Sequence, residues 1–116
     1  MTLSEDAYTD LVEEMLVSRY GEENVERGAY IEEVERFADF IVRAWPVDMA
    51  IEVENDFESV FDGVGQALVY AAGQSDMTPV IIRPPLEDGS DIIESRYLAH
   101  HVSIKEFNPK EWNTEE

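Results

Sequence analysis

Two apolar segments in the middle of the chain most constrain what it can fold into. The first covers residues 37–43 and the second covers residues 49–54, and a turn containing Trp45-Pro46 lies between them. Both segments are rich in apolar and β-branched residues, a composition that predicts β-strands. Because the connection is short, the two strands are expected to form an antiparallel hairpin at the centre of a sheet.

Carboxylates lie inside these predicted strands, with Asp39 in the first segment and Glu52 and Glu54 in the second. An ionised side chain in an apolar strand is costly unless it is paired or coordinates a cation. Side chains along a strand alternate between faces, so Glu52 and Glu54 point the same way. If the register brings Asp39 opposite Glu52, three carboxylates converge and require a counter-cation. Oxygen ligands of this kind favour Mg²⁺ or Mn²⁺, which can activate water and stabilise a phosphate during hydrolysis.

The remaining sequence predicts helices and strands on either side of the hairpin. In chain order these are an amphipathic helix over 3–20 that ends at Gly21, a strand within 25–31 broken at Gly28, a helix from Asp56 or Ser59 to Ala72, a strand over 79–83, a helix over 90–98 and a strand over 101–107. A strand–helix–strand connection returns parallel, so the expected fold class is α/β, with a mixed β-sheet flanked by helices. We expect a single domain over residues 1–107 and a flexible C-terminal tail over 108–116.

The charge of the chain indicates an unusual solvent. Twenty-seven acidic residues face eight Lys and Arg, and the formal net charge is −19. Repulsion of this size destabilises a compact state at ordinary salt, whereas at molar salt the Debye length falls to about 3 Å. Because the acidic residues are spread along the whole chain, we favour a protein of a halophile over two alternatives, an acidic mimic of nucleic acid and a binder of a basic partner. No signal peptide and no membrane-spanning run is evident, so a cytoplasmic protein without membrane contact is expected.

The order of these residues resembles a known superfamily. The series resembles the motifs of the PD-(D/E)XK nucleases, in particular of their RecB-like branch in halophilic archaea or their viruses. It consists of Asp39, then Glu52-Val53-Glu54, then a Gln-x-x-x-Tyr motif at Gln66 and Tyr70. The resemblance implies a restriction-endonuclease-like core with the element order αβββαβ. It also implies that Asp39, Glu52 and the Val53 carbonyl bind Mg²⁺ or Mn²⁺, and that Gln66 and Tyr70 support the site and contact DNA. Glu13 or Glu14, on the first helix, is a further candidate ligand in such a fold.

The chain departs from this pattern at one position, because Glu54 stands where the superfamily has its lysine. That lysine orients the attacking water and stabilises charge in the transition state. Glu54 either positions the water itself or marks a domain that has lost catalysis, and Arg43 is the nearest candidate for a compensating cation. The expected function is therefore metal-dependent hydrolysis of DNA phosphodiesters in repair, recombination or the biology of mobile elements and viruses. The alternative is a catalytically degenerate binding or structural protein. Because so few basic residues are present to bind DNA, a homodimer or a protein partner is expected to contribute.

Overall fold

The computed structural model describes residues 4–32, 35–44, 46–54, 77–85 and 103–112. Its elements are, in chain order, helix α1 (Glu5–Tyr20), the 3₁₀ turn η1 (Glu22–Asn24), strands β1 (Val25–Ile31), β2 (Arg36–Val42), β3 (Asp48–Val53), β4 (Met77–Arg83) and β5 (Ser103–Glu106), and the short helix α4 (Pro109–Trp112). The strands form one mixed sheet in the order β1-β2-β3-β4-β5. The expected α/β class is confirmed. The helices expected over residues 56–72 and 90–98 lie outside the described residues.

Helix α1 has a capping residue at each end, Ser4 at its beginning and Gly21 at its end. The Ser4 hydroxyl accepts a hydrogen bond from the amide of Ala7, and Glu5 and Asp6 place negative charge in the first turn, which complements the helix dipole. The helix ends at Gly21, whose φ of +92° suits a residue without a β-carbon. One stripe of the helix is buried against the sheet, formed by Tyr8, Val12, Met15 and Leu16. The amphipathic helix expected from the sequence is thereby confirmed.

The sheet is antiparallel on one side and parallel on the other. β1 pairs with β2 and β2 with β3 in antiparallel fashion, whereas β3, β4 and β5 run parallel. The expected hairpin and the parallel return of the later strand are both confirmed. β1 keeps the same register with β2 before and after Gly28, but the strand is locally irregular at the expected position, because Gly28 takes a φ of +64° and does not pair with Asp39.

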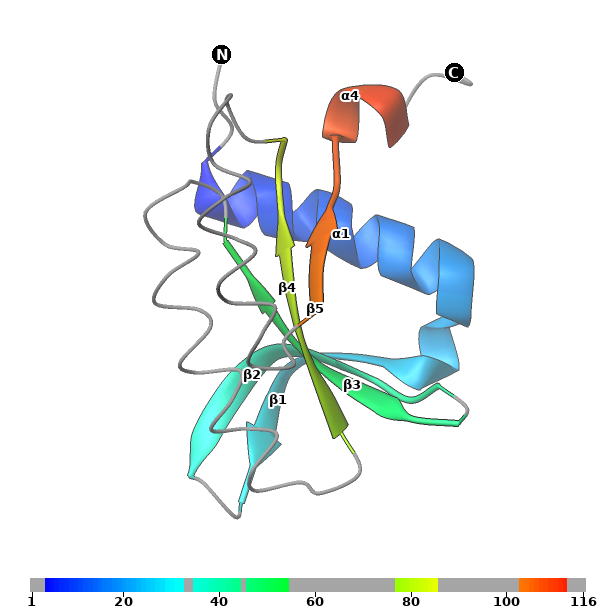
Figure 1. Cartoon of the computed structure of the whole chain (residues 1–116), viewed down its shortest axis with the longest axis vertical. Coiled ribbons are helices and arrows are strands. Elements are labelled where there is room, and N and C mark those ends of the chain that lie inside the picture. The colour runs from blue at the N-terminus through cyan, green and yellow to red at the C-terminus, as the bar shows by residue number, and fades with distance from the viewer. Residues whose placement is uncertain (1–3, 33–34, 45, 55–76, 86–102, 113–116) are drawn as a thin grey trace.

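Alternating side chains separate the sheet into two faces. Phe40, Ile51 and Val80 pack in one apolar cluster with the buried stripe of α1. The opposite face carries a second cluster that includes Ala38, Ile41 and Ala50, so the alternation of side chains along β2 is interrupted between Ala38 and Phe40. In Figure 1, α1 crosses behind β4 and β5, and the closed end of the β1–β2 hairpin projects away from the helix. We name the two sides of the sheet the helix face and the far face.

The first residues of the C-terminal segment form a short helix, whereas the sequence predicts a flexible tail there. Pro109–Trp112 form α4, within the stretch expected to be a flexible tail. The Asn108 side chain accepts a hydrogen bond from the amide of Lys110, and Pro109 supplies a backbone already suited to a first helical turn. The remaining residues, 113–116, lie outside the described part of the chain.

Candidate functional site

The candidate site is centred where β2 and β3 stop pairing. Their register covers Val42–Met49, Ile41–Ala50 and Phe40–Ile51, and no further pair follows. The amide of Val53 would next bond a carbonyl of β2, but it donates instead to Oδ2 of Asp39 at 2.7 Å. A carboxylate thus takes the place of a backbone acceptor at the point where the strands diverge.

Glu52 lies next to the point where β2 and β3 stop pairing. The last pair of the register, Phe40–Ile51, comes directly before it, and Asp39 and Glu52 are not themselves paired. Because the even-numbered residues of β3 alternate with the helix-face residues Ile51 and Val53, Glu52 belongs to the far face. Its side chain is only 5 % exposed, so this carboxylate has been taken almost entirely out of water. The pairing of Asp39 with Glu52 that the sequence allowed is not part of the ladder, which ends one residue earlier on each strand.

The Val53 carbonyl points toward the same place. The N–H and C=O of one strand residue face the same neighbouring strand. Since the Val53 amide reaches Asp39 and the Glu54 amide instead donates to the carbonyl of Ile82, the Val53 carbonyl faces β2. The Asp39 carboxylate and the Val53 carbonyl therefore lie at the gap between β2 and β3, and buried Glu52 is the residue before Val53.

Glu54 lies beside this group without completing a three-carboxylate cluster. It follows the last residue of β3, is 7 % exposed, and sits about 7 Å from Glu52 along the strand direction. Within the described ranges, no three histidine, aspartate or glutamate side chains are arranged to hold a metal ion. The convergence of Asp39, Glu52 and Glu54 on one point, which the sequence allowed, is therefore not seen.

The oxygens that remain nevertheless fit a hard divalent cation. Mg²⁺ commonly binds proteins through one or two carboxylates and keeps several waters, so Asp39, Glu52 and the Val53 carbonyl are the described groups that could hold such an ion. The burial of Glu52 is a further reason, because an ionised carboxylate withdrawn from water is stabilised by a nearby cation. The donor set contains neither thiolate nor imidazole, which favours Mg²⁺ or Mn²⁺ over zinc.

A buried cation that the sequence analysis did not single out lies next to Glu54. Arg83 ends β4, one residue beyond the Val53–Ile82 pair, so its backbone is level with Glu54 on the neighbouring strand. Its side chain donates to the carbonyl of Pro84 at 3.0 Å and lies 3.4 Å from a carboxylate oxygen of Glu106, and the residue is 6 % exposed. The signal in the sequence is an arginine that ends an otherwise apolar strand, directly before Pro84-Pro85.

The expectation that Arg43 compensates for the missing lysine is wrong. Arg43 follows the opposite end of the hairpin strands, where it pairs with Glu26 at 3.6 Å and with Asp48 at 3.9 Å. Its neighbour Val42 pairs with Met49, which is five residues, or about 16 Å, before Glu54. Antiparallel pairing places the end of β2 beside the beginning of β3 and far from Glu54.

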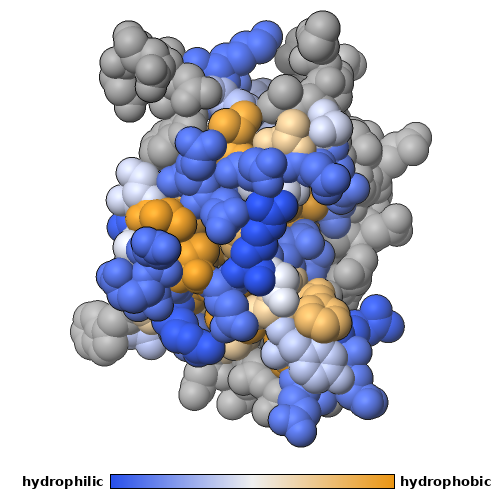
Figure 2. All heavy atoms as spheres, turned by 180° about the vertical axis from the view of Figure 1, so that it is seen from behind, coloured by the Kyte–Doolittle hydropathy of each residue, from blue (hydrophilic) through white to orange (hydrophobic). Residues whose placement is uncertain are grey.

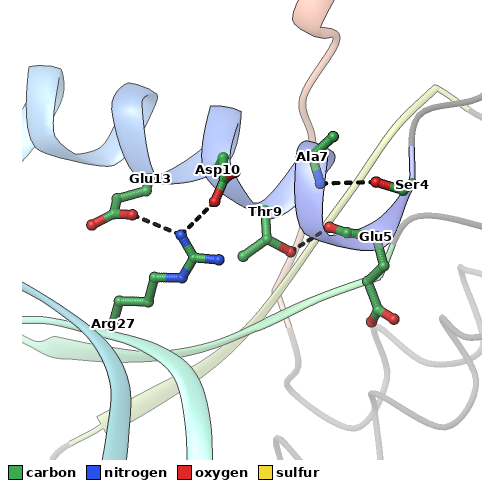
Figure 3. A network of polar contacts seen from close by, with 7 residues as sticks. All are labelled: Ser4, Glu5, Ala7, Thr9, Asp10, Glu13 and Arg27. Carbon is green, nitrogen blue, oxygen red and sulfur yellow. Dashed lines mark hydrogen bonds and ion pairs between the residues drawn. The ribbon is translucent and has the colours of Figure 1, made fainter.

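The expected contribution of α1 is also wrong for Glu13. This carboxylate accepts a hydrogen bond from Arg27 at 2.8 Å, and Asp10 accepts another from the same guanidinium nitrogen at 2.7 Å (Figure 3). Arg27 in turn lies over the ring of Phe40, a residue of the helix face. The sheet thus separates Glu13 from the far-face carboxylates. Glu14 is exposed on the same helix.

The Gln-x-x-x-Tyr motif at Gln66 and Tyr70 lies outside the described residues. The candidate site therefore consists of residues in or directly after the strands. Comparisons with known proteins add no further assignment. The chain matches no protein-family model, and no curated protein or solved structure is detectably similar to it. In the described part of the chain, no helix is long and apolar enough to cross a membrane.

Proposed function

We propose that this chain is an Mg²⁺- or Mn²⁺-dependent phosphodiesterase that acts on DNA and has the PD-(D/E)XK type of core. The order of a helix, three antiparallel strands and then a parallel strand is compatible with that core. The observation that carries the proposal is the position of Asp39. Its carboxylate reaches the backbone of Val53 across diverging strands, directly beside the buried residue Glu52 in the sequence.

Each residue near the gap has a distinct role in this proposal. Asp39, Glu52 and the Val53 carbonyl would hold the cation, which when bound polarises a phosphate and lowers the pKa of a coordinated water. Glu54 accepts a hydrogen bond from the attacking water and so orients it. Arg83 supplies the positive charge that the superfamily draws from a lysine, because it ends the strand next to Glu54.

Calorimetric titration with Mn²⁺ in multimolar KCl tests the cation site. We expect wild type and Glu13→Gln to bind the ion equally, since Glu13 lies on the helix face, and we expect Glu52→Gln to lose binding. Plasmid and single-stranded DNA cleavage are measured on the same three proteins. Cleavage that requires both Mn²⁺ and Glu52 supports the proposal. Wild-type binding that is unchanged in Glu52→Gln contradicts the cation site.

A non-catalytic binding protein on the same core is the second candidate. The observation in its favour is the burial of Glu54, which places a second carboxylate, and no lysine, beside Glu52. In that case wild type binds Mn²⁺ through Glu52, but no substrate is hydrolysed at any Mn²⁺ concentration. The same titration and cleavage assays therefore distinguish the two candidates.

A further inference from the structure

Strand β2 turns over at Asp39. Ala38 packs in the cluster on the far face and Phe40 in the cluster on the helix face, although side chains two residues apart in a regular strand share a face. Side chains of a regular strand stand roughly perpendicular to the sheet, whereas the backbone amides of a neighbouring strand lie in its plane. The turn at Asp39 therefore directs this carboxylate along the sheet, where it meets the Val53 amide at 2.7 Å.

Strand β1 turns over at the same level, and Gly28 is the residue that allows it to do so. Arg27 lies over the ring of Phe40 on the helix face, whereas Ala29 belongs to the cluster on the far face. Gly28 takes a φ of +64°, in the left-handed region that disfavours residues with a β-carbon, and it stands opposite Asp39 without pairing with it. The pairs directly before and after Gly28 keep one register, so the two strands turn over together.

We infer that Gly28 is a positioning residue for the candidate cation site. Its left-handed backbone lets the paired strands turn over, and this turn carries the Asp39 carboxylate to β3. With a negative φ at Gly28, both strands would continue regularly, and Asp39 would stand perpendicular to the sheet, away from the Val53 amide. The effect on Asp39 stands by itself, whereas the effect on cation binding rests on the proposed function.

Substitution of Gly28 isolates the effect of the backbone. A β-carbon at this position would meet no atom of the described residues within 4 Å, so alanine creates no collision there. Gly28→Ala either keeps the left-handed conformation at a cost or relaxes and withdraws Asp39. Gly28→Asn is the milder change, because asparagine tolerates the left-handed region better than alanine. Gly21→Ala is the matched control, since Gly21 also has a positive φ of +92° but ends α1, where the flexible Glu23 carboxylate can move aside.

Hydrogen exchange, followed by NMR in multimolar KCl without metal, tests the effect on Asp39 directly. The readout is the exchange rate of the Val53 amide divided by that of the Glu54 amide, which donates to the Ile82 carbonyl at 2.9 Å. General destabilisation raises both rates, whereas withdrawal of Asp39 raises only the first. We expect Gly28→Ala to raise the ratio by about 5- to 30-fold, which corresponds to the cost of holding alanine in the left-handed region.

The control variants should separate the role of Gly28 from a loss of stability. Gly28→Asn should raise the ratio by less than Gly28→Ala, and Gly21→Ala should leave it unchanged. In a protein that already carries Asp39→Ala, adding Gly28→Ala should no longer change the ratio, because the carboxylate that it positions is absent. Circular dichroism verifies that each variant is folded.

Calorimetry with Mn²⁺ on the same variants tests the consequence for the site. In Gly28→Ala, binding of the ion has to restore the left-handed backbone, so the affinity should fall by about 5- to 30-fold as well. Gly21→Ala should bind Mn²⁺ like wild type. The loss in Gly28→Asn should again be the smaller one.

Three results would overturn the inference. The first is an exchange ratio that is equal in wild type and Gly28→Ala, or that rises equally in Gly21→Ala. The second is a full effect of Gly28→Ala in the protein that lacks the Asp39 carboxylate. The third is Mn²⁺ binding that requires Asp39 but is equally tight in wild type and Gly28→Ala, which would leave the proposed function intact. If wild type binds no Mn²⁺ while the exchange ratio responds to Gly28→Ala, the cation site is refuted and the placement of Asp39 by Gly28 stands.

Discussion

At the scale of single residues, Asp39 combines two tasks that substitution can separate. Its Oδ2 accepts the hydrogen bond of the Val53 amide at 2.7 Å, and its charge belongs to the candidate cation site. Asp39→Ala removes both, and we expect it to lower the free energy of unfolding by about 1–3 kcal/mol, because the amide loses its acceptor. Asp39→Asn keeps an acceptor oxygen, so it should recover most of that stability while still losing Mn²⁺ binding.

Chemical denaturation in multimolar KCl and Mn²⁺ calorimetry measure the two effects of Asp39 separately. Asp48→Asn is a suitable control, since Asp48 lies at the opposite end of β3, where its carboxylate accepts a hydrogen bond from the amide of Ala44. Mn²⁺ affinity that survives in Asp39→Asn would show that Asp39 serves the strand junction only.

The role proposed for Arg83 is tested by charge-altering variants. Arg83→Met keeps a long side chain but removes the charge, so we expect kcat for DNA cleavage to fall by about 10²–10³ while Mn²⁺ affinity is retained. Arg83→Lys should recover part of the loss. Arg43→Met removes a cation that is about 16 Å from Glu54 by strand spacing, and it should cleave like wild type. Equal loss of activity in the Arg43 and Arg83 variants would point to a general charge effect and contradict a local role.

At the scale of elements, one hydrogen bond joins the beginning of α1 to the end of β5. The Tyr8 hydroxyl donates to the carbonyl of Phe107 at 2.9 Å, and their rings are in contact with centroids 5.9 Å apart. Burial raises the pKa of Tyr8 above its ordinary value near 10. The folded protein therefore keeps this proton in a pH range where the unfolded chain releases it. Since the unfolded state then binds fewer protons, stability is retained below about pH 10 and falls as the pH rises further.

Tyr8→Phe should remove this dependence on pH. At neutral pH we expect a loss of about 1 kcal/mol, the usual net value of one hydrogen bond. Above about pH 10 the difference from wild type should shrink, because the variant has no buried phenol to keep protonated. Denaturant titrations across neutral and alkaline pH measure this, with the exposed Tyr30→Phe as control. A constant difference between wild type and Tyr8→Phe at all pH values would contradict the assignment.

The elements also show why part of this molecule was predictable from its sequence. Local patterns were sufficient for α1, with its stop at Gly21, and for the hairpin of β2 and β3. The alternation of side chains was sufficient to place Glu52 on one face. What the sequence does not encode locally is which strand ends meet. The proximity of Arg83 to Glu54, the distance of Arg43 from it and the pairing of Glu13 with Arg27 all depend on strand order and on which face α1 covers.

At the scale of the whole molecule, the distribution of charge dominates. Hydrophilic residues cover most of the coloured surface seen from behind in Figure 2. Ion pairs in the described ranges are few and mostly exposed, and the best of them, Arg27 with Asp10 and Glu13, involves side chains that are 37 %, 64 % and 40 % exposed. Exposed pairs contribute at most about 1 kcal/mol each, so they do not offset the repulsion among the acidic residues. Stability is therefore expected to depend on screening by the solvent.

We expect the midpoint of thermal unfolding to rise with KCl concentration, and we expect the KCl requirement to fall when charge is removed. Replacing exposed Glu14, Glu22 and Glu32 by Gln changes the formal net charge from −19 to −16, which weakens the repulsion that salt must screen. Replacing the same three residues by Asp keeps the charge and is the matched control. Circular dichroism melts over a series of KCl concentrations, repeated with sucrose as a non-ionic solute, separate screening from the general effect of an excluded solute. Identical KCl requirements for the Gln and Asp variants, or equal stabilisation by sucrose, would show that charge repulsion does not set the stability of this fold.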